Sequence, residues 1–150
     1  MSDAENGIAQ EQSLTAFTPL SVKEPHWIYI NMSGDDGFQS INKQSYRLVP
    51  MVKEYKPNQY PLIVKLGQRV CMAITNINAD AHAMHLHGHS FQVMNMNGVP
   101  INGPVRDTLL TPRGGCTYME ICFDAENPGE WPFHCHMTYH LYAGMLTTVK

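Results

Sequence analysis

The chain has 150 residues, of which 10 are basic and 13 acidic, and it carries a formal charge of −3. A chain of this length can bury enough surface for one domain and is short for two. Because the charges are nearly balanced and form no runs, nucleic-acid binding and electrostatic attachment to a membrane have no support. No apolar run reaches the roughly 18 residues of a transmembrane helix, so no membrane segment is expected.

The first residues of the chain, MSDAENGIAQEQSLTA, are polar and carry a net negative charge. They lack the apolar core of a secretory signal. We therefore expect residues 1–16 to be a mobile lead or the remnant of a linker, and residues 17–150 to form a single domain.

Short segments rich in β-branched and aromatic residues alternate with glycine- and proline-containing turns along the rest of the chain. Such frequent turns exclude long helices, and the spacing of the segments predicts an all-β Greek-key sandwich or barrel. The expected elements are a strand at 27–30, a turn at 34–37, an ambiguous segment at 43–53, a hairpin of 62–66 and 70–74 about Gly67, a strand at 117–123, a short helical turn at 139–146 and a strand at 146–149.

Three cysteines lie in or near the expected strands: Cys71, Cys116 and Cys122. Cysteine is among the residues most often buried, so the leading interpretation is that all three are thiols of the core. A disulfide is the alternative. Cys116 and Cys122 lie too far apart on one expected strand to join each other, but either could reach Cys71.

Methionine-based copper binding is a weaker interpretation of this chain than methionine in the core, because methionine commonly fills gaps between packed strands. The methionines in or beside expected strands are Met72, Met84, Met94, Met96 and Met119.

His26 is expected to be a surface or hydrogen-bonded histidine rather than a ligand.

The segment HAMHLHGHSF, residues 82–91, holds four of the eight histidines of the protein. On a strand, residues two apart share a face and their neighbours point the other way. His85 and His87 therefore share one face, which we take as outward. His82 has the opposite parity and is expected to point inward.

The segment HCHMTYHLYAGM, residues 134–145, repeats this division. His134 and His136 share the outward face, whereas Cys135 points inward, where His140 and Met145 can meet it after the chain turns. A thiolate, imidazoles and a thioether select copper, and two histidines, one cysteine and a long axial methionine make up the blue-copper arrangement.

Two groups of side chains follow from this parity. The inward site is defined as His82, Cys135, His140 and Met145. The outward histidine array is defined as His85, His87, His134 and His136.

The motifs HAMHLHGHSF and NPGEWPFHCHMTYHLYAGM resemble the two copper-binding signatures of the carboxy-terminal cupredoxin domain of multicopper oxidases, the group of laccases, ascorbate oxidases and ferroxidases. The resemblance covers roughly residues 26–149 and implies a cupredoxin-like fold for residues 17–150. Ala83 stands where many members have proline, and His89 matches a histidine that is not a ligand. The implied ligands are His82, Cys135 and His140 with axial Met145 for type 1 copper, His85 for type 2 copper, and His87, His134 and His136 for the type 3 pair.

The same resemblance implies an activity. A reducing substrate, which could be a phenol, a metal ion or another small donor, would give electrons to the type 1 copper. They would pass from Cys135 to His134 and His136 and reach a trinuclear copper cluster that reduces dioxygen to water. Met145 in the axial position implies a low or middling potential. Members of the family usually work outside the cytoplasm, so a periplasmic or secreted location is expected.

Two details of that activity depend on carboxylates. An exposed carboxylate close to His82 or His140 would favour a metal ion as the electron donor. Protons for dioxygen reduction require an acid near the cluster, and Asp107, Asp124 and Glu126 are candidates by their place in the sequence.

The family builds its trinuclear cluster from eight histidines at an interface between two cupredoxin domains, and this chain supplies only the four of the outward histidine array. The other four must come from a second cupredoxin domain or from an identical subunit. A homo-oligomer with the cluster between subunits is therefore one hypothesis, since closed symmetric assemblies are the usual form.

Three alternatives remain. A simple blue-copper electron carrier would use the inward site alone, but it has no need of four outward histidines. A copper nitrite reductase also couples type 1 copper to a histidine site at an interface, but its cysteine-to-histidine spacing is longer and it lacks the His-Cys-His arrangement. A zinc site would account for only four of the eight side chains of the inward site and the outward array, and a purely structural role would not explain their division into two sets.

Overall fold

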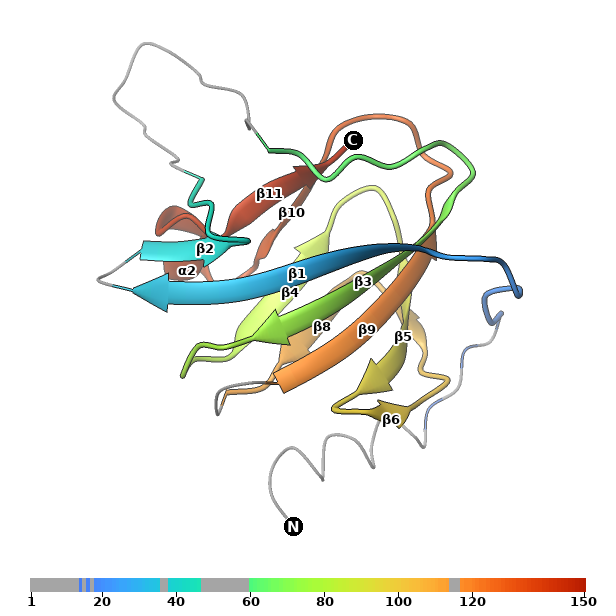
Figure 1. The fold of residues 1–150 in the computed structure, drawn as a ribbon, viewed down its shortest axis with the longest axis horizontal. Coiled ribbons are helices and arrows are strands. Elements are labelled where there is room, and N and C mark those ends of the chain that lie inside the picture. Colours follow the sequence, from blue (N-terminus) through green and yellow to red (C-terminus); the bar gives the residue numbers. More distant parts are fainter. Residues whose placement is uncertain (1–13, 15, 17, 36–37, 47–59, 114–116) are drawn as a thin grey trace.

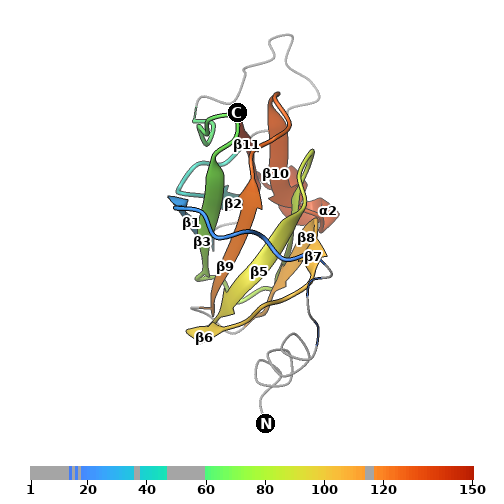
Figure 2. The same ribbon diagram turned by 90° about the vertical axis from the view of Figure 1, so that its right-hand side faces the viewer.

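Two β-sheets packed face to face form the body of the protein (Figure 1). The computed structural model describes residues 14, 16, 18–35, 38–46, 60–113 and 117–150. The two sheets lie as separate layers when the molecule is turned by 90° (Figure 2). The all-β sandwich that the turn spacing predicts is confirmed.

The larger sheet has the strand order β2-β1-β3-β9-β5-β6, and β7 pairs with β5. Its strands β1 and β3 run parallel and the remaining neighbours run antiparallel. The strands are β1 (His26–Asp35), β2 (Phe38–Ile41), β3 (Arg69–Asn76), β5 (Phe91–Met96), β6 (Val99–Pro100), β7 (Val105–Arg106) and β9 (Thr117–Asp124).

The smaller sheet has the order β11-β10-β4-β8, and each of the two histidine motifs lies partly on one of its two central strands. One short helix, α2 (Thr138–Tyr142), connects β10 to β11, as the expected helical turn predicts. The strands are β4 (His82–Leu86), β8 (Thr108–Thr111), β10 (Trp131–Cys135) and β11 (Leu146–Val149).

The core lies between the sheets, where side chains of both layers meet. Strands β4 and β10 bury alternate side chains, whereas the central strand β3 is buried along almost its whole length. Fully buried side chains come from both layers, among them Ile30, Met72, Met84, Phe123 and Phe133. Four of the five methionines expected in the core are buried there, and Met94 is only partly buried.

The predicted hairpin of residues 62–66 and 70–74 is wrong. Both edges of β3 are occupied, by β1 on one side and β9 on the other. Residues 62–66 instead run beside β11 of the opposite sheet, where the Leu62 N–H donates to the Thr148 carbonyl at 2.7 Å and the Lys150 N–H donates to the Leu62 carbonyl at 2.9 Å. The turn at Gly67 therefore carries the chain from one sheet to the other.

The prediction that the cysteines are core thiols is also wrong for two of them. Cys71 of β3 and Cys122 of β9 lie opposite each other in the sheet register, with a Cα–Cα distance of 4.2 Å, and form a disulfide. Their separation of 51 residues hides this proximity in the sequence. A disulfide is typical of proteins in oxidising compartments.

Several predictions fall partly or wholly outside the described residues: the lead at 1–16 except residues 14 and 16, the tip of the turn at 34–37, residues 47–53 and Cys116. The strands expected at 27–30, 70–74 and 117–123 lie within β1, β3 and β9, and the strand expected at 146–149 is β11. His26 is exposed at the start of β1. In the described part of the chain, no helix has the length and apolar character needed to cross a membrane.

Candidate metal sites

Strands β4 and β10 pair with each other and place the histidine motifs side by side. The register sets His134 opposite His85 and Cys135 opposite Met84. His82 and Cys135 are fully buried, whereas His85 and His134 are partly exposed and His136 is exposed. The alternation of the strands thus sends the two sets of side chains to opposite faces of the smaller sheet.

Three side chains of the inward site converge on one point. The Nδ1 atoms of His82 and His140 are 3.1 Å apart, and the Cys135 Sγ lies 3.8 Å and 3.5 Å from them, respectively. Ligand atoms bound at about 2.0–2.3 Å to a common metal such as zinc cannot be more than about 4.6 Å apart. The three atoms satisfy this limit, so the residues fit a metal ion.

The fourth member, Met145, is brought close by the turn that follows α2. Its side chain is fully buried, and its carbonyl accepts a hydrogen bond from the Cys135 N–H at 3.1 Å. Gly144 has a φ of +113°, and a Cβ there would lie 2.8 Å from the Gln39 carbonyl oxygen. Glycine is needed at this position both for its backbone angle and for the close approach of β2.

Burial sets the protonation of the inward site. It lowers the pKa of His82 to about 4, assisted by the neighbouring His140, and it lowers the pKa of His140 against the opposing effect of Asp80. Burial also raises the pKa of the Cys135 thiol. At neutral pH both imidazoles are uncharged, as metal ligands must be, and the thiol keeps its proton until a metal displaces it.

Two polar side chains that the sequence patterns did not reveal contact these histidines. The Asn78 Nδ2 donates to the His82 Nε2 at 2.8 Å. The Asp80 Oδ2 lies 4.0 Å from the His140 Nε2, which has no hydrogen-bond partner among the described residues. Both come from the β3–β4 connection, four and two residues before His82, and no pattern in a single sequence distinguishes them from ordinary turn residues.

The outward histidine array forms a continuous group of rings. Ring centroids are 4.7 Å apart for His85 and His87, 5.2 Å for His87 and His134, and 5.8 Å for His134 and His136. His136 also lies 5.5 Å from His85. All four side chains assigned to the array therefore meet on one face.

The hydrogen bonds of the array determine which ring nitrogens carry the protons. The Nδ1 atoms of His85 and His134 lie 2.9 Å and 3.0 Å from the backbone carbonyls of Asp107 and Cys135. A carbonyl can only accept, so each Nδ1 carries the proton and each Nε2 has the lone pair that a metal would use. In this structure the His134 lone pair faces the His87 Nε2 at 3.0 Å. Burial lowers the pKa of His134 and, with the adjacent His85 and His136, that of His87.

The array alone does not form a complete site. Across the described residues, His82, Cys135 and His140 are the one group of three or more histidine, cysteine or acidic side chains whose ligand atoms lie within 4.8 Å of one another. The Nε2 atoms of His87 and His134 are 3.0 Å apart and could share an ion, but further ligands are needed.

Among the carboxylates considered as proton sources, Asp107 lies beside the array. Its Oδ1 is 3.9 Å from the His85 Nδ1 and accepts a hydrogen bond from the Thr108 hydroxyl at 3.0 Å. Asp124 is instead bound by Arg69, whose two hydrogen bonds at 2.8 Å and 2.9 Å hold the carboxyl pKa below its usual value. The geometry thus favours Asp107 over Asp124.

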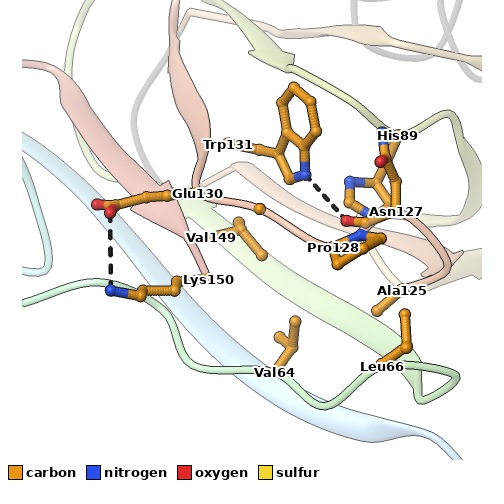
Figure 3. Close-up of a pocket in the computed structure, with 11 residues that line it drawn as sticks. Val64, Leu66, His89, Ala125, Asn127, Pro128, Glu130, Trp131, Val149 and Lys150 are labelled. Atoms are coloured by element: carbon orange, nitrogen blue, oxygen red, sulfur yellow. Dashed lines mark hydrogen bonds and ion pairs between the residues drawn. The ribbon is translucent and has the colours of Figure 1, made fainter.

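His89, the histidine expected to bind no metal, packs against the rings of Phe123 and Trp131. It lines a separate, largely apolar cavity of about 520 Å³ beside the end of the chain, where Glu130 and Lys150 form an ion pair (Figure 3). Among the described residues that line this cavity, none belongs to a group of three or more histidine, cysteine or acidic side chains spaced for a metal.

A sequence model of the family described as multicopper oxidase matches residues 21–150. The chain belongs to the multicopper oxidase family. The resemblance of its motifs to the carboxy-terminal cupredoxin domain is confirmed, and the buried group of two histidines and one cysteine in this multicopper oxidase domain is a type 1 copper-like site.

Individual relatives agree. The domain is 35% identical over 159 aligned positions to the iron multicopper oxidase fer1 of Mycosarcoma maydis, an alignment that covers 85% of the chain and 25% of that protein. It is 42% identical over 88 positions to the multicopper oxidase MmcO of Mycobacterium tuberculosis, covering 58% of the chain and 16% of that protein. The multicopper oxidase domain thus spans about a quarter or less of these curated relatives.

Solved structures share its fold. The laccase from Botrytis aclada aligns with a TM-score of 0.72 at 23% identity, covering 93% of this chain and 30% of that one. The multicopper oxidase McoA from Aquifex aeolicus aligns with a TM-score of 0.70 at 20% identity, covering 88% and 30%. The multicopper oxidase domain therefore has the cupredoxin sandwich.

Proposed function

We propose that this chain is the type 1 copper-bearing domain of a laccase-like or ferroxidase-like oxidase that uses dioxygen as electron acceptor. The observation that carries the proposal is the position of Cys135. Its thiol lies in the inward site, and it is bonded through the backbone to His134 and His136 of the outward array. The two sites therefore share a short covalent route for electrons.

Each side chain has a role in this proposal. His82, Cys135, His140 and Met145 would hold type 1 copper, His85 would hold type 2 copper, and His87, His134 and His136 would hold the type 3 pair. When bound, copper supplies the one-electron chemistry that takes electrons from a donor and reduces dioxygen to water. The protein buries the inward site, which keeps its imidazoles neutral, and carbonyl groups orient His85 and His134.

The outward array requires a partner that brings four more histidines. A second cupredoxin domain or an identical subunit would meet the array on the outer face of the smaller sheet. A periplasmic or secreted location agrees with the disulfide between Cys71 and Cys122.

Copper content together with visible and paramagnetic resonance spectra tests this function. An associated form should contain about one type 1 copper per chain and about three more coppers per interface. A blue-copper carrier would contain about one per chain and would not need the array. A nitrite reductase would reduce nitrite, and a zinc site would show no blue colour.

Replacement of His136 by alanine separates the two sites. The blue colour should survive, because His136 lies outside the inward site, while oxygen reduction by the associated protein should fall by at least tenfold. The matched change His26→Ala, at an exposed histidine of β1, should alter neither. Simultaneous loss of the colour and the oxygen reduction would contradict the division into an inward site and an outward array.

We also propose that the electron donor is a cation such as ferrous ion. Asp80 supports this, since its side chain is 62% exposed and its carboxylate is 4.0 Å from the His140 Nε2 at the edge of the inward site. Opposite charges attract a cationic donor to this edge, and the effect weakens with salt.

Stopped-flow reduction of the oxidised blue site checks the donor class without requiring a complete cluster. Ferrous ion should reduce it faster at low than at high ionic strength, and Asp80→Asn should slow ferrous ion severalfold while leaving uncharged hydroquinone unchanged. Equal effects of Asp80→Asn on the two donors would contradict a charge-selective entry point.

A further inference from the structure

The imidazole of His82 is hydrogen-bonded at both nitrogens. On one edge, the Asn78 Nδ2 lies 2.8 Å from Nε2. An amide nitrogen can only donate, so Nε2 accepts and the proton of the neutral ring is on Nδ1. Nδ1 is also the atom that faces the Cys135 sulfur and His140. Without a metal, His82 therefore holds its proton on the atom that would bind one.

His140 has the opposite arrangement. Because His82 Nδ1 donates across the 3.1 Å to His140 Nδ1, the latter accepts and its ring proton lies on Nε2, the atom nearest Asp80. His140 thus already has an unprotonated Nδ1 in the inward site. Of the two histidines, only His82 must move its proton before it can bind a metal.

The side chain that controls this proton is itself held in place. Asn78 is only 8% exposed, and its own N–H donates to the Asn76 Oδ1 at 2.9 Å. Its Nδ2 donates at 3.0 Å to the Gln39 Oε1, on β2. The Gln39 amide packs against Gly34, where a Cβ would lie 2.6–2.8 Å from it. The carboxamides of Asn78 and Gln39 are hydrogen-bonded to each other, so the orientation of one group, with its oxygen or its nitrogen toward the partner, determines the orientation of the other.

We propose that Asn78 and Gln39 form an amide relay that reverses when a metal binds the inward site, and this inference rests on the proposed role of His82 as a ligand. A metal on Nδ1 requires the ring proton to be on Nε2, which then needs an acceptor. Rotation of the Asn78 carboxamide presents Oδ1 to that proton. Rotation of Gln39 turns its Nε2 to donate to the same oxygen.

The protons balance in this rearrangement. His82 keeps one proton, which moves from Nδ1 to Nε2, and Cys135 releases its thiol proton to solvent. The oxygen of Asn78 has two lone pairs and can accept from both His82 and Gln39. A carboxylate could only accept and an ammonium could only donate, so a carboxamide is suited to both states. Asn78 and Gln39 are positioning residues that act through His82.

Two substitutions of equal charge distinguish this relay from general electrostatics. In Asn78→Asp, a carboxylate oxygen faces the His82 Nε2 and can only accept, so the variant favours the tautomer that binds a metal. In Gln39→Glu, the carboxylate can only accept from Asn78, so it holds the Asn78 amide nitrogen toward His82. The relay predicts that copper(I) affinity, measured on the full chain by competition with a chelator, is retained or raised by Asn78→Asp. It predicts a fall of about 10–100-fold with Gln39→Glu. A simple charge effect would raise the affinity in both variants and would overturn the relay.

Asn78→Leu removes the partner of Nε2 and should also weaken copper(I) binding about 10–100-fold. Asn31→Leu, at an exposed position of β1, makes the same change of residue type and should leave the affinity unchanged. Unaltered affinity in a folded Asn78→Leu variant would contradict the relay.

Imidazole nitrogen-15 spectra of the wild-type chain observe the tautomer directly and do not depend on any variant folding. The ring proton of His82 should be on Nδ1 in the copper-free chain and on Nε2 after one equivalent of copper(I). A chain that binds copper(I) through Cys135 but keeps the same His82 tautomer overturns the relay alone. A chain that binds no copper(I) contradicts the proposed function and the relay with it.

Discussion

The residues of the inward site differ in whether they must lose a proton before they can bind a metal. Burial keeps His82 and His140 uncharged at neutral pH, so neither has to lose a charge before it binds. The same burial raises the pKa of Cys135, which must give up a proton. The thiol is therefore the group whose ionisation couples copper binding to pH.

Copper affinity should rise with pH in a defined way. Around neutral pH, where burial keeps both imidazoles uncharged, only Cys135 releases a proton, so the apparent affinity should increase about tenfold per pH unit. Toward the His82 pKa of about 4 and below it, that ring is protonated as well, and the dependence should steepen. Calorimetric titrations in buffers of different ionisation enthalpy measure the protons released. Release of two or more protons near pH 7 would show that the histidines are charged in the copper-free chain.

At the level of structural elements, strand alternation explains most of what the sequence could predict. The period of two along β4 and β10 separated His82 from His85 and Cys135 from its flanking histidines before any tertiary contact was known. Residues 62–66 show the limit of such reasoning. Their composition is that of a strand, but their partner is β11, and pairing between distant segments leaves no local pattern.

The connection from α2 to β11 offers a test at this level. Gly144→Ala should destabilise the protein by on the order of 3 kcal/mol, because alanine is disfavoured at a φ of +113° and its Cβ would meet the Gln39 carbonyl at 2.8 Å. Gly67→Ala is the matched control, since Gly67 has a φ of +80° with nothing within 4 Å, and it should cost about 1 kcal/mol. Denaturant unfolding measures both, and equal losses would contradict the importance of the contact with β2.

For the whole molecule, the outward array is the feature that points beyond this chain. The rings gather on the outer face of the smaller sheet, and Leu110 of β8 lies on the same face, opposite Ala83 and 60% exposed. A partner that completes the array would cover this leucine.

Leu110→Asp tests that contact. Burying an unpaired charge at the interface should cost on the order of 3 kcal/mol, which weakens association more than a hundredfold. Sedimentation should show weaker association, and the rate of oxygen reduction should fall with it. The blue absorption of the inward site should persist. Val22→Asp, at a fully exposed position, should have no effect. Normal association of the Leu110 variant would place the partner elsewhere.

The sequence by itself determined the fold class, the family and the division of the candidate ligands into two sets, because these depend on residue type and on the short period of a strand. Only the tertiary structure decided which segments pair, that Cys71 joins Cys122, and that Asn78, Gln39 and Asp80 surround the inward site. Those contacts join residues brought together by strand pairing, sheet packing and the β3–β4 turn, and none of them follows from a local repeat. For His134-Cys135-His136, the sequence predicted that the inward site and the outward array meet at this segment. The tertiary structure showed which side chains surround the inward site and which surround the outward array.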